Sequence, residues 1–338
     1  MKTIVCKNPN NFEVAEVEKP VLKKGEALIK MKRIGICGTD IHAYHGRQPF
    51  FSYPRVLGHE LAGEIVELSN ETDLFEIGNK VTIIPYLECG ECIACRNGKT
   101  NCCVNLQVLG VHTDGGMQEY LNIPYSHLIK VDELSFEQAA TVECLSIGAH
   151  AVRRASIQKD EWVLVIGAGP IGLGVMQFAM NAGAKVIMLD RSAERLAFCK
   201  NWAASVYIVN GGGGVLQHIK DITNGDMPTV VFDATGNAQS MNEAYQFAAH
   251  SGRLVYVGLV QADLQFPDPE IHKRELTILS SRNATRQDFN TVITALKEKK
   301  FNVAPFITNI VPFDNLPCDF EKIFSAGNSN IKVLVELL

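Results

Sequence analysis

Residues 162–172 constrain the fold of this 338-residue chain more than any other segment. Their sequence, Trp-Val-Leu-Val-Ile-Gly-Ala-Gly-Pro-Ile-Gly, is an apolar strand that runs into Gly167, Gly169 and Gly172, and an apolar helical stretch follows at residues 173–182. Glycines at this spacing permit a tight turn and let the backbone approach a pyrophosphate, which the helix N-terminus then binds. The pattern alone is weak evidence, so the residues around it matter.

A second strand, at residues 185–190, strengthens this interpretation because it ends in an acid. Asp190 follows Gly172 by 18 residues, near the position where a carboxylate is expected to contact the ribose hydroxyls of an adenosine. A carboxylate there repels a 2′-phosphate, which favours NAD over NADP. Arg191 leaves the alternative open, because its guanidinium could hold that phosphate in another geometry.

The alternation of strands and helices after residue 145 predicts a doubly wound parallel sheet. Its strands are expected at residues 163–166, 185–189, 206–209, 229–232, 253–257 and 276–279. Before residue 142 the chain instead shows many short strands and turns, which predict an antiparallel, barrel-like fold. The clearest of these strands are at residues 2–6, 26–34, 61–68 and 80–85, and the C-terminal segment adds a helix at 289–299 and a strand at 332–336.

Four cysteines form a closely spaced run, Cys89-Gly-Glu-Cys92-Ile-Ala-Cys95, followed by Cys103. Four thiolates fill every position of a tetrahedral zinc ion and leave none for a reaction, so this spacing predicts a structural zinc site that folds a lobe. An iron–sulfur cluster is the competing interpretation. Cys102 adjoins Cys103 and could replace it, although the spacing favours Cys103.

A second set of residues offers mixed ligands. Cys37 lies in Gly-Ile-Cys-Gly-Thr-Asp, the pair His59 and Glu60 follows Gly58, and Glu143 follows Val142. Taken alone, each of them is as readily a core cysteine, a hydrogen-bonded histidine or a solvated carboxylate. Together they predict a zinc site of the catalytic type, because mixed sulfur, nitrogen and oxygen ligands with an exchangeable position characterise such sites.

Composition excludes several classes of protein. The length of 338 residues is enough for two domains with cores of their own, and a content of 46% hydrophobic and 20% charged residues is typical of a globular protein. The net charge of −5 argues against nucleic-acid binding. Residues 162–184 carry no charge, but Pro170 and the glycines favour a buried strand, turn and helix over a membrane span. No signal peptide is expected, and zinc-binding cysteines must stay reduced, which favours a cytoplasmic location.

These motifs resemble the zinc-dependent medium-chain dehydrogenase family, which includes alcohol, sorbitol and threonine dehydrogenases. The resemblance also rests on Gly58-His-Glu-x-x-Gly63 and Asp233-Ala-Thr-Gly236, and it covers essentially the full chain. It implies a Rossmann domain, a doubly wound parallel α/β sheet, plus a GroES-like β-barrel catalytic domain that carries the structural zinc lobe. The implied domains are residues 1–144 (catalytic, with the lobe at about 86–105), 145–282 (NAD-binding) and 283–338 (a return to the catalytic domain).

The resemblance further implies two zinc ions per chain, NAD, and an active site in a cleft between the domains. Thr39 and His42 would relay a proton from the alcohol to solvent, while Glu143 would ligate the catalytic zinc, directly or through water, until substrate binds. A homodimer or homotetramer is also expected. The implied cofactor-binding residues are Gly167, Gly169, Pro170, Ile171, Gly172, Asp190, Arg191, Arg195, Thr235, Gly236, Val257 and Gly258.

Shorter segments resemble the branch of bacterial sugar-acid dehydrogenases that act on galactonate or gulonate. They are residues 47–50, 53–56 and 280–283, and within them Arg282, Asn283 and Arg47 are candidates to bind a substrate carboxylate. The expected activity is therefore oxidation of a secondary alcohol of a polyhydroxy substrate, with a sugar acid preferred. A sorbitol-type polyol dehydrogenase, an L-threonine 3-dehydrogenase and a non-catalytic protein that binds NAD and zinc are the alternatives.

Overall fold

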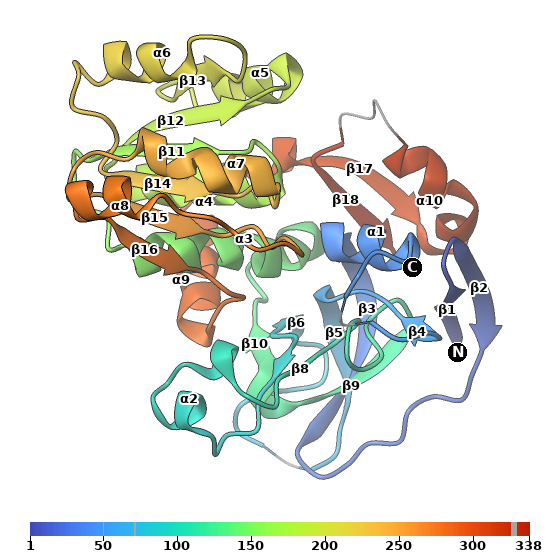
Figure 1. Ribbon diagram of the computed structural model, residues 1–338. Coiled ribbons are helices and arrows are strands. Elements are labelled where there is room, and N and C mark those ends of the chain that lie inside the picture. The colour runs from blue at the N-terminus through green and yellow to red at the C-terminus, as the bar shows by residue number, and fades with distance from the viewer. Residues whose placement is uncertain (50, 71, 326–329) are drawn as a thin grey trace. The chain divides into compact units, whose positions relative to one another are not determined.

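The computed structural model (Figure 1) describes residues 1–49, 51–70, 72–325 and 330–338. Phe50, which belongs to one of the sugar-acid segments, therefore lies outside the described residues. The chain forms two compact units. Unit 1 contains Met1–Cys144 and Thr285–Leu338, and unit 2 contains Leu145–Ala284. Within the described ranges, no helix is both long and apolar enough to cross a membrane.

Unit 2 is built on a six-stranded parallel sheet with the strand order β13-β12-β11-β14-β15-β16 (Figure 1). The first strand of the unit, β11, lies in the middle of this order, with β12 and β13 on one side of it and the later strands on the other. This is the strand order of a Rossmann sheet. The strands are β11 (Trp162–Ile166), β12 (Lys185–Asp190), β13 (Tyr207–Asn210), β14 (Val230–Asp233), β15 (Arg253–Tyr256) and β16 (Thr277–Ser280). The doubly wound parallel sheet predicted from the sequence is therefore confirmed.

The middle strands of this sheet are apolar along their whole length because both of their faces are covered. Val163, Leu164, Val165, Val230 and Val231 are completely buried, as expected for parallel strands with helices on either side. The helices of this unit are α4 (Pro170–Asn181), α5 (Ala193–Trp202), α6 (Val215–Ile222), α7 (Ala238–Glu243) and α8 (Asp268–Arg274), with a 3-10 turn, η3 (Ala244–Phe247).

Unit 1 has a seven-stranded sheet with the order β10-β6-β5-β3-β18-β17, and β9 pairs with β3 as well. Its pairs are antiparallel except for β17 with β18. The strands are β3 (Glu26–Ile36), β5 (Glu60–Leu68), β6 (Lys80–Ile83), β9 (Tyr120–Pro124), β10 (Leu128–Lys130), β17 (Ile307–Pro312) and β18 (Lys332–Glu336). The C-terminal segment thus completes the sheet of the N-terminal one.

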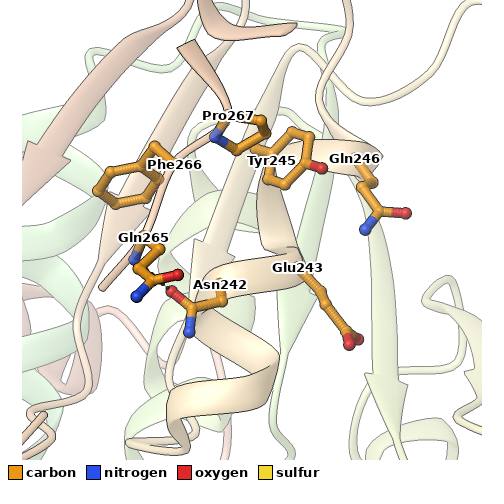
Figure 2. Close-up of a pocket in the computed structure, with 7 residues that line it drawn as sticks. All are labelled: Asn242, Glu243, Tyr245, Gln246, Gln265, Phe266 and Pro267. Atoms are coloured by element: carbon orange, nitrogen blue, oxygen red, sulfur yellow. Dashed lines mark hydrogen bonds between the residues drawn. The ribbon is translucent and has the colours of Figure 1, made fainter. Parts of the chain in front are cut away.

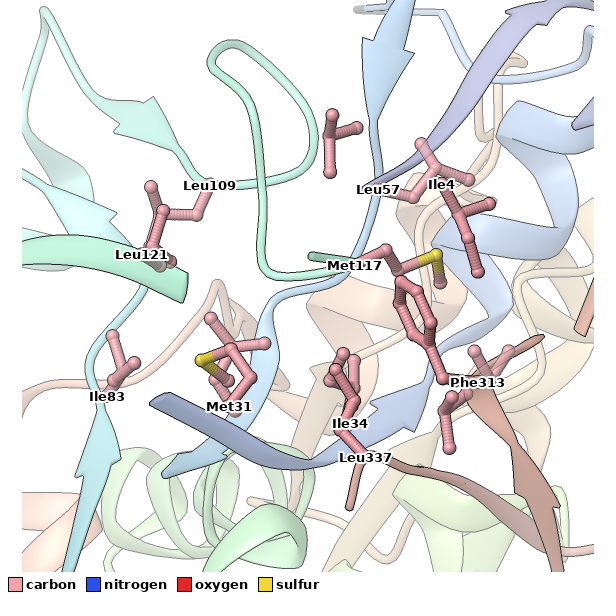
Figure 3. Close-up of a cluster of buried hydrophobic side chains, with 14 of the residues drawn as sticks. Ile4, Met31, Ile34, Leu57, Ile83, Leu109, Met117, Leu121, Phe313 and Leu337 are labelled. Carbon is pink, nitrogen blue, oxygen red and sulfur yellow. The ribbon is translucent and has the colours of Figure 1, made fainter. Parts of the chain in front are cut away.

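Two smaller sheets flank this one. One has the order β2-β1-β4, from β1 (Lys2–Asn8), β2 (Asn11–Glu16) and β4 (Arg55–Val56), and the other is the pair β7 (Tyr86–Leu87) and β8 (Gln107–Val108). Side chains from these strands and the main sheet meet in one apolar core, part of which is drawn in Figure 3. Ile4, Met31, Ile34 and Leu57 are fully buried there. This core fixes the strands that carry the metal-ligating residues described below.

The described residues of unit 1 also form helices and 3-10 turns. The helices are α1 (Gly38–Tyr44), α2 (Ile93–Arg96), α9 (Arg286–Lys297) and α10 (Leu316–Phe324), with 3-10 turns η1 (Thr100–Cys102), η2 (Tyr125–His127), η4 (Ala304–Phe306) and η5 (Phe313–Asn315). The longest helix, α3 (Phe136–Ala155), contains the boundary between the two units.

Candidate metal centres and cofactor-binding loop

Cys37 is held in place by the helix that it starts. It is the N-cap of α1, and its backbone N–H donates a 2.8 Å hydrogen bond to Oδ2 of Asp40 in the first helical turn. The other oxygen of Asp40 accepts a 3.2 Å hydrogen bond from the N–H of Gly58. Asp40 is 1% exposed, so one buried carboxylate joins the loop of Cys37 to the residue before His59.

Glu60 is the first residue of β5 and is completely buried. It lies opposite Gly35 of β3 in the antiparallel register. A Cβ atom added at Gly35 would lie only 1.9 Å from Glu60 Oε2, so any other residue at that position would displace the carboxylate. The glycine in the Cys37 motif therefore makes room for the acid in the His59 motif.

The ligand atoms of Cys37, His59 and Glu60 lie within 4.8 Å of one another. Zinc–ligand lengths are about 2.0–2.3 Å, so these atoms are close enough together to surround one ion after small shifts, and the mixture of sulfur, nitrogen and oxygen donors suits zinc. In addition, the buried Nδ1 of His59 has no hydrogen-bond partner among the described residues. Buried polar atoms without a partner are uncommon and often mark functional sites.

The electrostatics of this group also favour a cation. Burial by itself lowers the pKa of His59, but the negative charges of Cys37 and Asp40 outweigh burial and raise it well above its ordinary value. Burial also raises the pKa of Asp40, against the opposing effect of His59. A positive charge placed among these acidic groups is stabilised.

A buried lysine pairs with Glu60. Lys332, the first residue of β18, is 1% exposed, and its Nζ donates to both carboxylate oxygens of Glu60 at 2.6 and 2.7 Å and to the carbonyl of Ile36 at 3.1 Å. Burial lowers the pKa of Lys332, but the nearby Cys144, Glu60 and Cys37 raise it above its ordinary value. Because burial keeps the Cys144 thiol protonated, Glu60 is the partner that matters.

Glu143 lies in α3 and is 4% exposed. It is not part of the group of mutually close ligand atoms formed by Cys37, His59 and Glu60, and its Oε1 instead accepts a short hydrogen bond from the hydroxyl of Tyr86. Burial and the charge of Glu60 raise the pKa of Glu143 to about 7, against the opposing effect of His59. Burial and the charge of Glu143 raise the pKa of Tyr86 well above its ordinary value, so the tyrosine remains the donor.

The four sulfur atoms of Cys89, Cys92, Cys95 and Cys103 lie within 4.8 Å of one another. The Cys92–Cys95 and Cys89–Cys103 sulfur distances are 3.5 and 3.4 Å, much longer than a disulfide of about 2.05 Å and close to the roughly 3.8 Å between thiolates around a tetrahedral zinc ion. Backbone N–H groups of Cys95 and Val104 lower the pKa of Cys92 to about 6. The geometry thus fits a four-thiolate zinc site.

Cys102, the alternative fourth ligand, does not belong to this group. It is exposed at the end of η1, whereas Cys103 is 3% exposed and its sulfur accepts hydrogen bonds from the N–H groups of Cys89 and Asn105. The hairpin of β7 and β8 closes the base of the lobe, because Tyr86 pairs with Val108 and Leu87 with Gln107. No disulfide joins any of the cysteines that the structure describes.

In unit 2 the glycine-rich loop joins β11 to α4. Gly169 is the N-cap of α4, and Pro170 and Ile171 form its first turn. A Cβ atom added at Gly172 would lie 1.8 Å from the carbonyl oxygen of Gly167, so only glycine permits this close turn. The loop leaves the helix N-terminus available for an anion, which is the arrangement that binds a pyrophosphate.

Asp190 ends β12 next to this loop. Its Oδ2 accepts a 2.7 Å hydrogen bond from the N–H of Ala168, and its Oδ1 accepts one of 2.8 Å from Ser192. The acid is thereby tied to the glycine-rich turn on one side and to the start of α5 on the other. From α5, Arg195 approaches the loop, since a Cβ atom at Gly169 would lie 3.3 Å from its Nη1, whereas Arg191 lies against Gly211.

The other predicted cofactor residues follow the next two strands of the sheet. Thr235 and Gly236 follow β14, and Val257 and Gly258 follow β15. Buried Asp233 ties these segments together: its carboxylate accepts hydrogen bonds from the N–H and Oγ1 of Thr235 at 2.9 and 2.6 Å, and its carbonyl accepts from Val257 at 2.9 Å. Because β11, β12, β14 and β15 are parallel neighbours, these segments all lie at one edge of the sheet.

The predicted relay and substrate residues have less defined surroundings. Thr39 and His42 both lie on α1. His42 is largely exposed. The part of its ring that is buried and the positive charge of Arg47 lower its pKa. Arg47 is exposed in unit 1, while Arg282 is exposed and Asn283 half-buried after β16 in unit 2. Neither unit by itself brings the predicted substrate residues together.

A pocket of about 430 Å³ lies elsewhere in unit 2, between the end of α7, η3 and the segment at residues 265–267 (Figure 2). Asn242 and Gln265 line it and are joined by a 2.7 Å hydrogen bond from the Gln265 N–H to Asn242 Oδ1. It contains none of the predicted metal, cofactor or substrate residues, so its size alone gives it no role.

Three residues of the metal site, Lys332, Tyr86 and Asp40, were not predicted from the sequence. Asp40 could have been found, because Cys37-x-x-Asp40 has the spacing of a capping box. The other two could not, since each is distant in sequence from its partner: Lys332 is 272 residues from Glu60 and Tyr86 is 57 from Glu143. Only the folded sheet brings them together.

Comparison with known proteins agrees with both halves of this description. A family model described as the alcohol dehydrogenase GroES-like domain matches residues 23–133, and one described as zinc-binding dehydrogenase matches residues 170–298. The first covers Cys37, His59, Glu60 and the four-cysteine lobe, and the second covers Asp190 and the end of the glycine-rich loop from Pro170 onward.

Similar proteins cover the chain from end to end. L-galactonate-5-dehydrogenase of Escherichia coli K12 is 42% identical over 95% of each chain, and sorbitol dehydrogenase of Bacillus subtilis 168 is 33% identical over 82% of this chain and 81% of its own. Among solved structures, the alcohol dehydrogenase RspB from Escherichia coli CFT073, complexed with NADH, has a TM-score of 0.93 and 32% identity and covers 100% of this chain and 99% of its own.

Proposed function

Because the chain belongs to the zinc-type medium-chain alcohol dehydrogenase family, we propose that it oxidises a secondary alcohol of a sugar acid and transfers the hydride to NAD. Membership of this family makes the protein a zinc-dependent alcohol or polyol dehydrogenase that uses a nicotinamide cofactor. The observation that carries the proposal is the group of half-buried Cys37 with buried His59 and Glu60, whose mixed ligands fit a catalytic zinc ion.

We assign the catalytic zinc to Cys37, His59 and Glu60, with Glu143 as an additional ligand, and the structural zinc to Cys89, Cys92, Cys95 and Cys103. Zinc bound at the first site would act as a Lewis acid that lowers the pKa of an alcohol. The nearby Asp40 orients the ligand loops, because it accepts hydrogen bonds from the N–H groups of both Cys37 and Gly58. Such outer partners of metal ligands typically tune both affinity and activity.

Lys332 changes the expected charge of this site. From the ligands alone, ligation by Glu143 would give a zinc-loaded site a charge of −1 and make it less favourable for an alcohol that loses its proton. Buried Lys332 adds one positive charge beside Glu60. The thiolate, the two carboxylates and the ammonium then carry two net negative charges, which a divalent ion neutralises. With zinc bound and no substrate present, ligation by Glu143 would therefore give a neutral site.

The proton released from the substrate needs a path to solvent, and we assign it to Thr39 and His42. Both lie on α1, whose N-cap is Cys37, so the helix that positions the thiolate also positions the relay. The lowered pKa of His42 keeps its imidazole neutral at pH 7, and a neutral imidazole can accept a proton.

For the cofactor we assign Gly167, Gly169, Pro170, Ile171 and Gly172 to the pyrophosphate and Asp190 to the adenosine ribose. NAD would accept the hydride, and the protein holds its dinucleotide in place. Residues 145–282 form the cofactor-binding domain in this proposal, while residues 1–144 and 283–338 form the catalytic domain. The remaining assigned residues around the cofactor are Arg191, Arg195, Thr235, Gly236, Val257 and Gly258.

The sugar-acid preference has two supports. L-galactonate-5-dehydrogenase of Escherichia coli K12 is 42% identical to the chain, and the arginines Arg282 and Arg47 can bind a carboxylate bidentately. A neutral polyol is the second candidate substrate, because the sorbitol dehydrogenase of Bacillus subtilis 168 is 33% identical. We also propose a homodimer or homotetramer and a reducing, cytoplasmic location, the latter because cysteines that bind zinc must stay reduced.

The proposed reaction is tested by following the absorbance of NADH with zinc-loaded protein and a mixture of polyols and aldonates. Reduction of NAD that is lost after chelation and restored by added zinc is expected. A matched Cys37→Ser protein, which lacks one catalytic ligand, should remain inactive with zinc. NAD reduction that persists in Cys37→Ser at the wild-type rate would overturn the assignment of the reaction to this metal site.

A further inference from the structure

We propose that Tyr86 is a positioning residue for Glu143. Its hydroxyl holds one carboxylate oxygen, so that Glu143 can yield its place at the metal to an incoming ligand. The inference rests on the proposed function, because it takes the group of Cys37, His59 and Glu60 as a zinc site. It concerns a tyrosine to which the proposed function assigns no part in binding zinc or NAD or in carrying the proton.

The first argument is the contact itself. The Tyr86 hydroxyl donates to Oε1 of Glu143, and both side chains are 4% exposed. A carboxylate that leaves a metal ion inside a protein needs another partner, because a buried charge without one is strongly destabilising. The tyrosine hydroxyl is such a partner, and it takes only one of the two oxygens, which leaves Oε2 for the metal.

The second argument is that the tyrosine is rigidly held. The rings of Tyr86 and Phe289 of α9 form a T-shaped pair, with 6.3 Å between ring centroids and 81° between ring planes, and Phe289 is completely buried. The backbone of Tyr86 is paired with Val108 in the hairpin of β7 and β8. The donor therefore keeps its position while the carboxylate changes partners.

The third argument is the difference between the two acids of the site. Glu60 has both oxygens bound by Lys332 at 2.6 and 2.7 Å, so its position is fixed by an ammonium ion whose three donors are all used. Glu143 has a neutral donor, which leaves it the more exchangeable of the two. A neutral hydrogen bond restrains a carboxylate more weakly than a buried ion pair does.

The hairpin of β7 and β8 also connects Tyr86 to the four-cysteine lobe. β7 and β8 close the base of the four-cysteine lobe, and Tyr86 lies three residues before Cys89. The lobe therefore fixes the strand from which the hydroxyl reaches Glu143. In this way the structural metal site supports the residue that positions an acid of the catalytic one.

The inference is tested with the full-length protein carrying Co²⁺ at the catalytic site and Zn²⁺ in the lobe. Imidazole, which binds an exchangeable metal position whatever the natural substrate is, is titrated while the visible bands of the cobalt–thiolate centre are recorded. Tyr86→Phe keeps the ring but removes the donor, so Glu143 should hold the metal more firmly. We expect the Kd for imidazole to rise roughly 10-fold or more, within the range for outer partners of metal ligands.

Three further variants make this result specific. Tyr256→Phe removes a buried hydroxyl that donates to the Met241 carbonyl at 2.7 Å in unit 2, and it should leave the imidazole Kd unchanged. In a Glu143→Gln background, Tyr86→Phe should have no further effect, because the two residues then act as one unit. Phe289→Leu should shift the Kd in the same direction by loosening the ring, which keeps the test informative if Tyr86→Phe is unstable.

The possible outcomes are separable. An imidazole Kd for Tyr86→Phe within twofold of the wild-type value, or an equal shift in the Glu143→Gln background, would overturn the role of Tyr86 while leaving the zinc site intact. A wild-type protein that shows no cobalt–thiolate bands would instead overturn the proposed catalytic zinc site, and the inference with it.

Discussion

Lys332 and Glu60 show how strongly one residue can depend on another inside this protein. Both side chains are at most 1% exposed, and the ammonium contacts both carboxylate oxygens and a backbone carbonyl. Removing one partner of a buried ion pair leaves an uncompensated charge, which costs about 3–5 kcal/mol, whereas replacing both partners by neutral groups is often tolerated.

We therefore expect Lys332→Met to lower the melting temperature strongly, with a loss of about 3–5 kcal/mol of stability. The double variant Lys332→Met with Glu60→Gln should recover most of the loss, because it buries no unpaired charge. Differential scanning calorimetry on protein that keeps zinc in the four-cysteine lobe but lacks the catalytic metal measures this directly. Lys2→Met, which breaks the exposed pair with Asp314, is the control and should change little. A double variant no more stable than Lys332→Met would refute this explanation.

His42 gives a prediction about pH. Its pKa is lowered from 6.5 by partial burial and by Arg47, and only the neutral imidazole can accept the relayed proton. The kcat should therefore rise with pH through an acidic limb below pH 6.5, and Arg47→Gln should move that limb to higher pH. Arg55→Gln, whose arginine pairs with Asp114 at 3.3 Å, should not move it. An unchanged limb in Arg47→Gln, or its persistence in His42→Ala, would count against the relay.

Asp190 gives a prediction about cofactor choice. Asp190→Asn keeps the size of the side chain and one acceptor for the contacts to Ala168 and Ser192, but removes the charge that repels a 2′-phosphate. The ratio of kcat/KM for NAD to that for NADP should fall roughly 10- to 100-fold, or about 1–3 kcal/mol. Asp221→Asn, a substitution on α6 of the same unit, is the control. A wild-type enzyme that prefers NADP would contradict the assignment.

At the scale of elements, the four-cysteine lobe should be separable from the catalytic site. Cys92→Ser removes a thiolate on which the packing of the lobe depends, so we expect unstable or insoluble protein, because binding energy at such a site is folding energy. Cys37→Ser should fold, retain one zinc ion per chain and be inactive. Cys102→Ser removes an exposed thiol outside the group and should keep two zinc ions. Metal analysis gives the zinc content of each variant, and thermal melts give its stability. A stable, active Cys92→Ser protein would contradict the structural-zinc assignment.

The elements also show what a sequence can and cannot predict. Apolar strands such as β11 and β18 were predicted closely, β18 at residues 332–336, because continuous burial produces an unambiguous pattern. Helix α3 was not predicted, although Ser135 and Gln138 form reciprocal hydrogen bonds of 3.2 and 2.9 Å at its start, which is a capping-box signal. The helix matters because it carries Glu143.

The candidate site also contains residues that the sequence predicted and residues that it did not. Ligands such as Cys37 and Cys92 were predicted because metal sites use few residue types at short spacings. Lys332 and Tyr86 have no such signature, since a lysine at the start of a strand or a tyrosine before a cysteine run is ordinary in any chain. Their roles come from the pairing of β18 with β3 and from the hairpin of β7 and β8, which are properties of the fold.

At the scale of the whole molecule, the chemistry is divided between the two units. Unit 1 contains the ligand group of Cys37, His59 and Glu60, together with Lys332, Glu143 and the four-cysteine lobe. Unit 2 contains the glycine-rich loop and Asp190. This division explains why a change in one unit should leave the tasks of the other intact. Metal content should not respond to Asp190→Asn, and NAD binding should not respond to Cys37→Ser.

The most direct measurement is kcat/KM on a panel of galactonate, gulonate, sorbitol, threonine and ethanol, with zinc-loaded protein and NAD. We expect an aldonate to exceed the other substrates, because a carboxylate can bind Arg282 bidentately. Arg282→Ala should remove that advantage while leaving slow turnover of sorbitol unchanged. Equal or better turnover of sorbitol or threonine by the wild-type enzyme would contradict the sugar-acid assignment, and no NAD reduction with any of the five would contradict the proposed reaction itself.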